Sequence, residues 1–471
     1  MRSRYHTAAG LLILSSLVVG SLDTKKVLGA DAIEACRLRE TSYPRQLNEH
    51  LFTAFPPISK NLPSAGTFTL AIVPVHYSDL PAEAEPLKRV RDDMQALVEY
   101  YELQSEGRVR FRWSVTEQSV LLPGTANELE GMKGSAAEVD YAKRVLAAVD
   151  PFVNFEGVHS AVFVLPPGSK NTNGIQLMYP MKISVPLVTS EQNIFNFLMA
   201  GTYFGNSVRP EWTYWAHELG HAFHLPDLYA QPWNPTVRNM RKFEIPGPFH
   251  GWDFMATQDG PSRTINMWLR WVRGWATDSQ IHCRRASEIG DLEVDLVPVE
   301  TSASGTKAVV IAFGSSRALV IEGRRETKFN LRNDVIDEGV LAYEVDSSLG
   351  HGEIPLLPIK LGDKISVSPG GDRNPPYFDS LITEGQVLRY ENLYIKFLKS
   401  GNLDRVRIST SELVESRPIV STTTTVSQKP QPKGGLSKQQ VCKRPGMKRK
   451  VGGVWQICRR KSGKTVWVVN R

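Results

Sequence analysis

From Phe68 to Leu165 the chain alternates between apolar strand patterns and amphipathic helix patterns. Residues 68–77 form an apolar, β-rich run that predicts a buried strand. Apolar residues then recur at three- and four-residue steps from Leu87 to Tyr101, which predicts an amphipathic helix that ends by Gly107. Residues 109–115 alternate strictly, as in a half-buried strand. A helix over 136–149 and a buried strand over 161–165 follow, so the order predicts a mixed α/β domain.

The pattern changes in the second half of the chain. Two more helices are predicted, over 212–223 and 265–272. Beyond Cys283, short β-rich runs are separated by turn residues, which favours a β-sandwich-like domain. These runs cover 292–299, 308–313, 318–322, 340–345, 393–398 and 405–408. The chain as a whole is therefore expected to be of the α+β class.

Charge separates the end of the chain from its body. The whole chain has 56 Lys and Arg against 49 Asp and Glu, but the segment from Ser416 onward contains 14 of those basic residues and no acidic one. Residues 416–437 are rich in Thr and Pro, which predicts a linker. Residues 438–471 predict a small basic module with Trp455 and Trp467. Because the positive charge belongs to this appendage, we expect no nucleic-acid binding by the folded body; the tail suits anionic cell-envelope polymers, or serves only as a solubilising extension.

The N-terminus has the features of an export signal. Arg2 and Arg4 precede an uncharged apolar run over 8–22, and residues 30–32 supply a small-x-small cleavage pattern. Residues 1–32 are therefore predicted to be a signal peptide and the protein to be secreted, with or without attachment to the cell wall. The run is shorter than a typical membrane-spanning helix, so no transmembrane span is expected in the mature form, a retained signal anchor being the alternative.

The four cysteines fit an exported chain, in which an even number usually forms disulfides. We expect Cys36 to pair with Cys283, and Cys442 with Cys458 within the basic module. None of them has the Cys-x-x-Cys spacing of a zinc site. A thiolate of Cys36 that caps a metal and keeps the protein latent is the alternative for that residue.

The strongest chemical signal is His217-Glu218-Leu219-Gly220-His221. In a helix, His217 and His221 are one turn apart, so both imidazoles project from one face and can hold one ion. Glu218 lies about 100° round the helix from His217, outside the metal shell but within reach of a water molecule beside the ion. The spacing predicts a divalent metal site with a general base.

Around this motif the chain resembles the immune inhibitor A family of secreted bacterial metallopeptidases, which are metzincin-like zincins. The resemblance covers about residues 67 to 345, and its most specific part is the segment from His217 to Tyr229. The other matching segments are Tyr100-Tyr101, Ser105 to Gly107, Gly251 to Met255, and Trp268 to Trp275. The family has Gly at the position of His224, where its turn is expected to need a positive φ.

The resemblance implies zinc on His217, His221 and Asp227, with Glu218 as the base and Met255 in a turn beneath the metal. Pro226 disfavours helix at Leu225, which is consistent with a turn that brings Asp227 back to the metal. The sequence leaves other third ligands open: His224 ranks second, and a Glu, His250 or Asp253 could also complete the site. Family members often carry structural Ca²⁺, for which the sequence offers no liganding motif.

These observations predict a secreted zinc-dependent endopeptidase that acts on proteins or peptides. Two alternatives stay open: a decayed, peptidase-like protein that binds the cell surface through its basic tail, and a hydrolase of amide bonds in cell-wall material. The expected organisation is a signal peptide, an N-terminal segment, a zincin-like mixed-sheet catalytic domain with an active-site helix, a β-rich domain, a linker and a disulfide-clipped module. Their residues are 1–32, 33–66, 67–284, 285–415, 416–437 and 438–471.

Overall fold

The computed structural model divides the chain into two compact units, Met1–Pro418 and Ile419–Arg471. It describes residues 32–41, 51–57, 62–126, 135–166, 187–194, 196–200, 210–229, 249, 251–256, 262–329, 338–362, 380–415, 448–451, 454–461 and 464–469. The predicted signal peptide up to residue 31, the linker and Cys442 lie outside these residues, as does the predicted pairing of Cys442.

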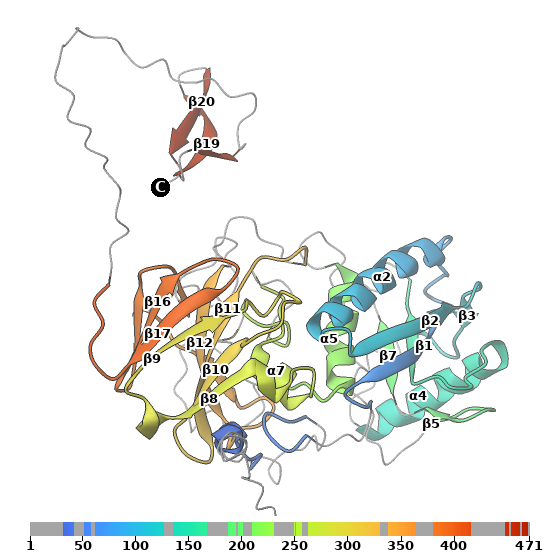
Figure 1. Ribbon diagram of the computed structural model, residues 1–471. Coiled ribbons are helices and arrows are strands. Elements are labelled where there is room, and N and C mark those ends of the chain that lie inside the picture. The colour runs from blue at the N-terminus through green and yellow to red at the C-terminus, as the bar shows by residue number, and fades with distance from the viewer. Residues whose placement is uncertain are drawn as a thin grey trace, which may run out of the picture. The chain divides into compact units, whose positions relative to one another are not determined.

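The first sheet of the larger unit has the strand order β2-β1-β4-β7, with β3 beside β1 (Figure 1). Every strand pair that the structure describes in this sheet is parallel, whereas the sequence analysis expected a mixed sheet. The strands are β1 (Gly66–His76), β2 (Val109–Val115), β3 (Val120–Leu121), β4 (Ser160–Val164) and β7 (Phe197–Ala200). A short antiparallel pair, β5 (Leu187–Val188) and β6 (Asn193–Ile194), lies outside this sheet.

Helices cover both faces of this sheet, so the central strand β1 is buried on both sides. Phe68, Leu70 and Ile72 of β1 belong to the same apolar cluster as residues of α2 (Pro86–Gln104) and α5 (Glu211–Ala222). Ala71, Val73 and Val75 pack instead in the cluster that contains α4 (Ser135–Val149). Figure 1 shows α2 and α4 on opposite sides of the sheet. The one-residue alternation of a strand thus separates two cores.

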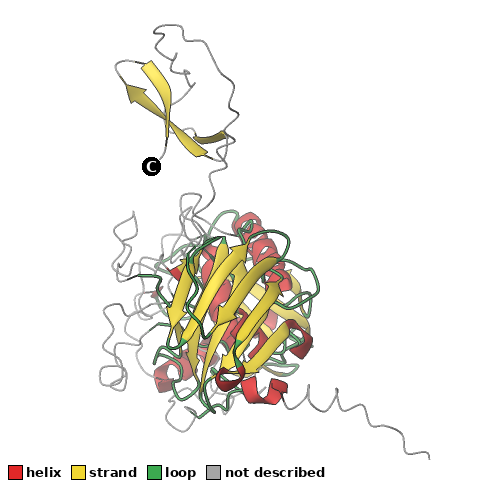
Figure 2. Ribbon diagram, turned by 60° about the vertical axis from the view of Figure 1, so that its left-hand side comes forward, coloured by secondary structure: helices red, strands yellow, loops and turns green. Residues whose placement is uncertain are grey.

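Two further sheets pack face to face as a sandwich, since one buried apolar cluster contains residues of both. Figure 2 shows their strands face-on. One has the order β13-β12-β11-β10-β8 with β14 beside β12, and the other has the order β15-β16-β17-β9. Their strands are β8 (Ile281–Arg285), β9 (Asp291–Leu296), β10 (Ala308–Ala312), β11 (Arg317–Arg324), β12 (Gly339–Asp346), β13 (Leu356–Pro358), β14 (Leu381–Ile382), β15 (Val387–Tyr390), β16 (Leu393–Lys399) and β17 (Asp404–Ser409). Short 3-10 helices lie at Asp150–Phe152, Asp278–Gln280 and Ala286–Glu288.

The six-stranded sheet joins the sandwich to the rest of the unit. Val309 and Ile311 of β10 face the sandwich core, whereas Val310 belongs to the cluster that extends through α7 (Met267–Val272) to α2 and α5. Four of the largest fully buried side chains are tryptophans in this cluster: Trp215, Trp252, Trp268 and Trp275. The sequence analysis placed a boundary between the catalytic and β-rich domains at residues 284 and 285. The apolar core extends across this position without a break.

The predicted disulfide between Cys36 and Cys283 is present, with the two Cα atoms 5.9 Å apart. It ties the short helix at residues 32–36 to β8. Because Cys36 is oxidised, it offers no thiolate to a metal.

The smaller unit contains an antiparallel sheet of β18 (Lys448–Val451), β19 (Val454–Lys461) and β20 (Lys464–Val469). In its register Cys458 lies opposite Trp467.

Within the described residues, none of the helices combines the length and the apolar character needed to cross a bilayer. The expected α+β class is confirmed.

Candidate metal centre

Helix α5 carries the motif and is buried over nearly its whole surface. Eleven of its twelve residues are buried, among them Trp212, Trp215 and Leu219. Its N-terminal amide at Trp212 donates to the Asp93 carboxylate of α2 at 3.3 Å. An acceptor at this end is favourable because the first helical N–H groups have no partner within the helix. The helix is therefore held at a fixed position beneath the sheet.

His217 and His221 lie side by side on one face of α5, as predicted, with ring centroids 5.0 Å apart. Each imidazole Nδ1 faces a backbone carbonyl, Phe254 O at 3.2 Å for His217 and Leu225 O at 2.8 Å for His221. A carbonyl can only accept, so both Nδ1 atoms donate. In the neutral imidazoles the lone pairs are then on Nε2, which is the arrangement found in metal-binding histidines.

Asp227 is the acidic residue that meets both imidazoles. Its Oδ1 lies 3.2 Å from His217 Nε2 and 3.5 Å from His221 Nε2. All three side chains are buried.

The turn that returns Asp227 to the helix is a Schellman motif. His224 has φ +66° and its amide donates to His221 O at 2.9 Å, while the Leu225 amide donates to Gly220 O at 3.0 Å. Glycine is usual at this position because a left-handed φ strains other residues by about 1–2 kcal/mol. The expected positive φ is confirmed. The ring of His224 packs against Phe52, with centroids 5.3 Å apart.

The donor atoms fit a tetrahedral zinc ion. Two ligands at about 2.0–2.1 Å from zinc are separated by about 3.3 Å, close to the two distances from Asp227 Oδ1. With both Nδ1 atoms protonated, two neutral imidazoles would direct lone pairs at an anionic oxygen, which is repulsive unless a cation lies between them. His217, Glu218 and His221 also have ligand atoms that lie within 4.8 Å of one another. Within the described part of the chain, this is the one group of three or more such residues that could hold a metal ion.

Without a metal, a proton takes the place of the cation. Burial lowers the pKa of His217, but the hydrogen bond to Asp227 and the charges of Glu218 and Asp227 raise it to about 9. Burial and the neighbouring His217 lower the pKa of His221 to about 4. Burial opposes ionisation of Asp227, yet its histidine neighbours hold the pKa of that carboxyl well below its usual value.

Glu218 stands beside these ligand atoms. Its Oε2 lies 3.9 Å from His221 Nε2, and its side chain keeps 15% of its surface exposed, more than either histidine. Burial, together with the charge of Asp227, raises the pKa of Glu218 to about 8. A carboxyl group of this kind can take up and return a proton near neutral pH.

Met255 lies directly beneath the helix. A Cβ atom added at Gly220 would lie 2.8 Å from Met255 Sδ and 3.2 Å from the hydroxyl oxygen of Tyr101. Glycine at this position therefore permits close contact between α5 and the turn that contains Met255. The Phe254 carbonyl of the same turn accepts from His217, so the turn also orients a proposed ligand.

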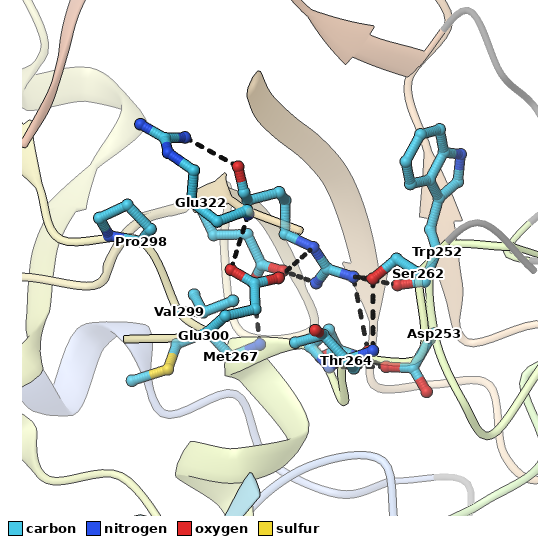
Figure 3. A network of polar contacts seen from close by, with 12 residues as sticks. Trp252, Asp253, Ser262, Thr264, Met267, Pro298, Val299, Glu300 and Glu322 are labelled. Atoms are coloured by element: carbon cyan, nitrogen blue, oxygen red, sulfur yellow. Dashed lines mark hydrogen bonds and ion pairs between the residues drawn. The ribbon is translucent and has the colours of Figure 1, made fainter. Parts of the chain in front are cut away.

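A buried polar network holds this turn against the six-stranded sheet (Figure 3). Asp253 accepts from the amides of Met255 at 2.7 Å and Asn266 at 2.6 Å, and burial raises the pKa of its carboxyl to about 6. Arg324 of β11 donates to Trp252 O and forms an ion pair with Glu322. Asp253, a possible third ligand in the sequence analysis, is thus engaged in fixing the turn, and His250 lies outside the described residues.

The sequence analysis missed one residue of this site. His351, which follows β12, is buried and lies against Asp227, with Nε2 3.7 Å from Asp227 Oδ2. It is distant from the motif in the sequence, and its only local signal is a histidine within the small-residue segment from Ser347 to Gly352.

No protein-family model matches the chain, and no curated protein matches it either. Its function must therefore be inferred from the chemistry of this cluster.

Proposed function

We propose that this protein is a secreted, zinc-dependent endopeptidase of a zincin-like fold, related to the immune inhibitor A metallopeptidases. The observation that carries the proposal is the approach of Asp227 Oδ1 to both His217 Nε2 and His221 Nε2, at distances suited to ligands of one tetrahedral zinc ion. Three protein ligands and one open position are typical of catalytic rather than structural zinc.

Zinc bound by these residues would lower the pKa of a water molecule and polarise the carbonyl of a scissile bond. Glu218 lies on the exposed side of the cluster, where it accepts a proton from the attacking water and delivers it to the leaving amine. The carbonyls of Phe254 and Leu225 keep the Nδ1 protons of His217 and His221 in place, so both Nε2 atoms stay available.

The geometry at His224 favours this proposal over a decayed, peptidase-like surface protein. The feature of the sequence that keeps the decayed alternative open is His224, which stands where the resembling family has glycine. His224 adopts the left-handed φ that a glycine would adopt, and Asp227 reaches both imidazoles despite the substitution. The chemical groups of the site are thus assembled in one place.

Substrates of this activity are proteins or peptides, and the predicted signal peptide places the enzyme outside the cell. We further propose that the basic tail attaches it to anionic cell-envelope polymers, with no role for nucleic acid. Cleavage of amide bonds in cell-wall glycopeptides is the alternative substrate class, because the metal chemistry is the same.

Metal analysis combined with casein cleavage tests the proposal. The purified protein should contain about one zinc per chain and cleave unfolded casein, and Glu218→Gln should keep the zinc while losing the cleavage. The matched control is Glu102→Gln, the same change at an exposed position of α2, which should remain active. Zinc-free protein that is inactive on casein and on cell-wall glycopeptide would refute the assignment and favour the surface-binding alternative.

A further inference from the structure

His351 makes two approaches to Asp227. Its Nδ1 accepts a hydrogen bond from the Asp227 amide at 3.1 Å. Because an amide N–H can only donate, Nδ1 is unprotonated and the ring proton of the neutral imidazole is on Nε2. That Nε2 faces Asp227 Oδ2 at 3.7 Å. One ring therefore contacts the backbone of Asp227 and faces its carboxylate.

The two carboxylate oxygens of Asp227 consequently face different partners. Oδ1 lies toward His217 and His221, whereas Oδ2 lies toward His351. The ring centroids of His221 and His351 are 6.1 Å apart. With Nδ1 bonded to an amide and Nε2 on the Oδ2 side, His351 is placed to orient a ligand rather than to act as one.

The loop that carries His351 is held firmly on both sides. The Gly350 amide donates to Glu353 Oε2 at 2.8 Å, and Thr53 Oγ1 of the N-terminal segment donates to Leu349 O at 3.0 Å. Ile354 is buried and has φ +58°, a conformation that is a genuine outlier for a β-branched residue. Such strain persists where the surrounding structure fixes the backbone, and it is concentrated at functional sites.

We propose that His351 is a positioning residue for the third zinc ligand. His351 fixes the backbone and the carboxylate of Asp227. Asp227 lies beyond the end of α5, so the hydrogen bonds of that helix do not hold it in place. The inference rests on the proposed zinc site, and it adds that the β-rich part of the chain completes that site. Metal affinity thereby depends on a loop that follows β12.

Zinc affinity, measured by competition with a chromophoric chelator, tests this role together with the visible spectrum of the Co²⁺ form. His351→Phe removes both contacts and should weaken zinc binding 10–100-fold and alter the Co²⁺ spectrum. His351→Asn keeps an acceptor for the Asp227 amide, so its zinc affinity should fall by only about threefold to tenfold. His159→Phe is the matched control, because His159 Nδ1 accepts the Thr69 amide in the same way at 3.1 Å but on the first sheet.

The outcomes separate this inference from the proposed function. If the unaltered chain binds neither Zn²⁺ nor Co²⁺, the zinc site itself is refuted. If the unaltered chain binds zinc and His351→Phe binds it within twofold as tightly, or if His159→Phe weakens binding equally, the role of His351 is overturned. Should His351→Phe fail to fold, His351→Asn replaces it: affinity within twofold of the unaltered chain, with an unchanged Co²⁺ spectrum, overturns the proposal.

Discussion

Gly220 lies within the zinc motif, and its replacement by alanine sets two effects of opposite sign against each other. In a helix interior, alanine is favoured over glycine by about 1 kcal/mol. At this position, however, the new Cβ would lie 2.8 Å from Met255 Sδ and 3.2 Å from Met255 Cε. Met255 is fully buried in the main apolar cluster, so a shift of its side chain disturbs the packing around it.

Overpacking of a buried site typically costs about 1–3 kcal/mol. With the gain in helix propensity subtracted, Gly220→Ala should lower the free energy of unfolding by about 1 kcal/mol. In a Met255→Ala background, Sδ and Cε are absent and only the Tyr101 hydroxyl, at 3.2 Å, stays close. There the same substitution should become neutral or stabilising.

Urea unfolding of the unaltered chain, the two single variants and the double variant, all with EDTA present, measures this double-mutant cycle. The expected result is a coupling energy of about 1–2 kcal/mol, with Gly220→Ala destabilising the unaltered chain but not the Met255→Ala variant. If Gly220→Ala stabilised the unaltered chain by about 1 kcal/mol, helix propensity alone would govern the position. The close contact between helix and turn would then be refuted.

Three further predictions concern stability. Replacing Cys36 and Cys283 by Ser opens a loop that spans 247 residues and should lower the free energy of unfolding by about 2–5 kcal/mol, which thermal unfolding with and without reductant would reveal. Burial raises the pKa of Asp93 from 3.8 to about 6, so the folded chain binds its proton more tightly than the unfolded chain, and stability falls as pH rises through that window. Asp93→Asn should therefore match the unaltered chain near pH 4 and exceed it at pH 7 by at most about 3 kcal/mol; a difference that does not change with pH would contradict this. Arg324→Met removes the cation that is ion-paired with the buried Glu322 and Glu300 and should cost about 3–5 kcal/mol in urea unfolding, whereas a neutral effect would show that the network does not hold the turn.

Local periodicity was sufficient to locate most of the long elements. The predicted strand at 109–115 coincides with β2. The helix predicted over 136–149 begins one residue after α4 and ends with it, and the helix predicted over 212–223 begins and ends one residue after α5. Short strands such as β13 and β14 escaped prediction, because two or three residues carry no measurable period. The parallel pairing of the first sheet also could not be read from the strands, since pairing joins segments that are distant in the sequence.

In the candidate site too, relations within one helix could be predicted from the sequence, whereas contacts between distant segments could not. His217 and His221 could be paired from the sequence because helix geometry places residues four apart on one face. Asp227 could be suggested by Pro226 and the family resemblance, but its approach to both imidazoles depends on the left-handed φ of His224. His351 gave no usable signal, since its place beside Asp227 follows from the packing of the loop after β12.

The sequence by itself therefore determined the helix that presents two imidazoles and a carboxyl group, because those relations repeat within one turn. Only the tertiary structure decided which acidic oxygen meets the imidazoles, which turn supports them and which distant histidine faces the acid. The physical reason is the sequence range of the interactions. Hydrogen bonds within a helix fix the relative positions of residues that are close in the sequence, whereas contacts across a core depend on how whole elements pack.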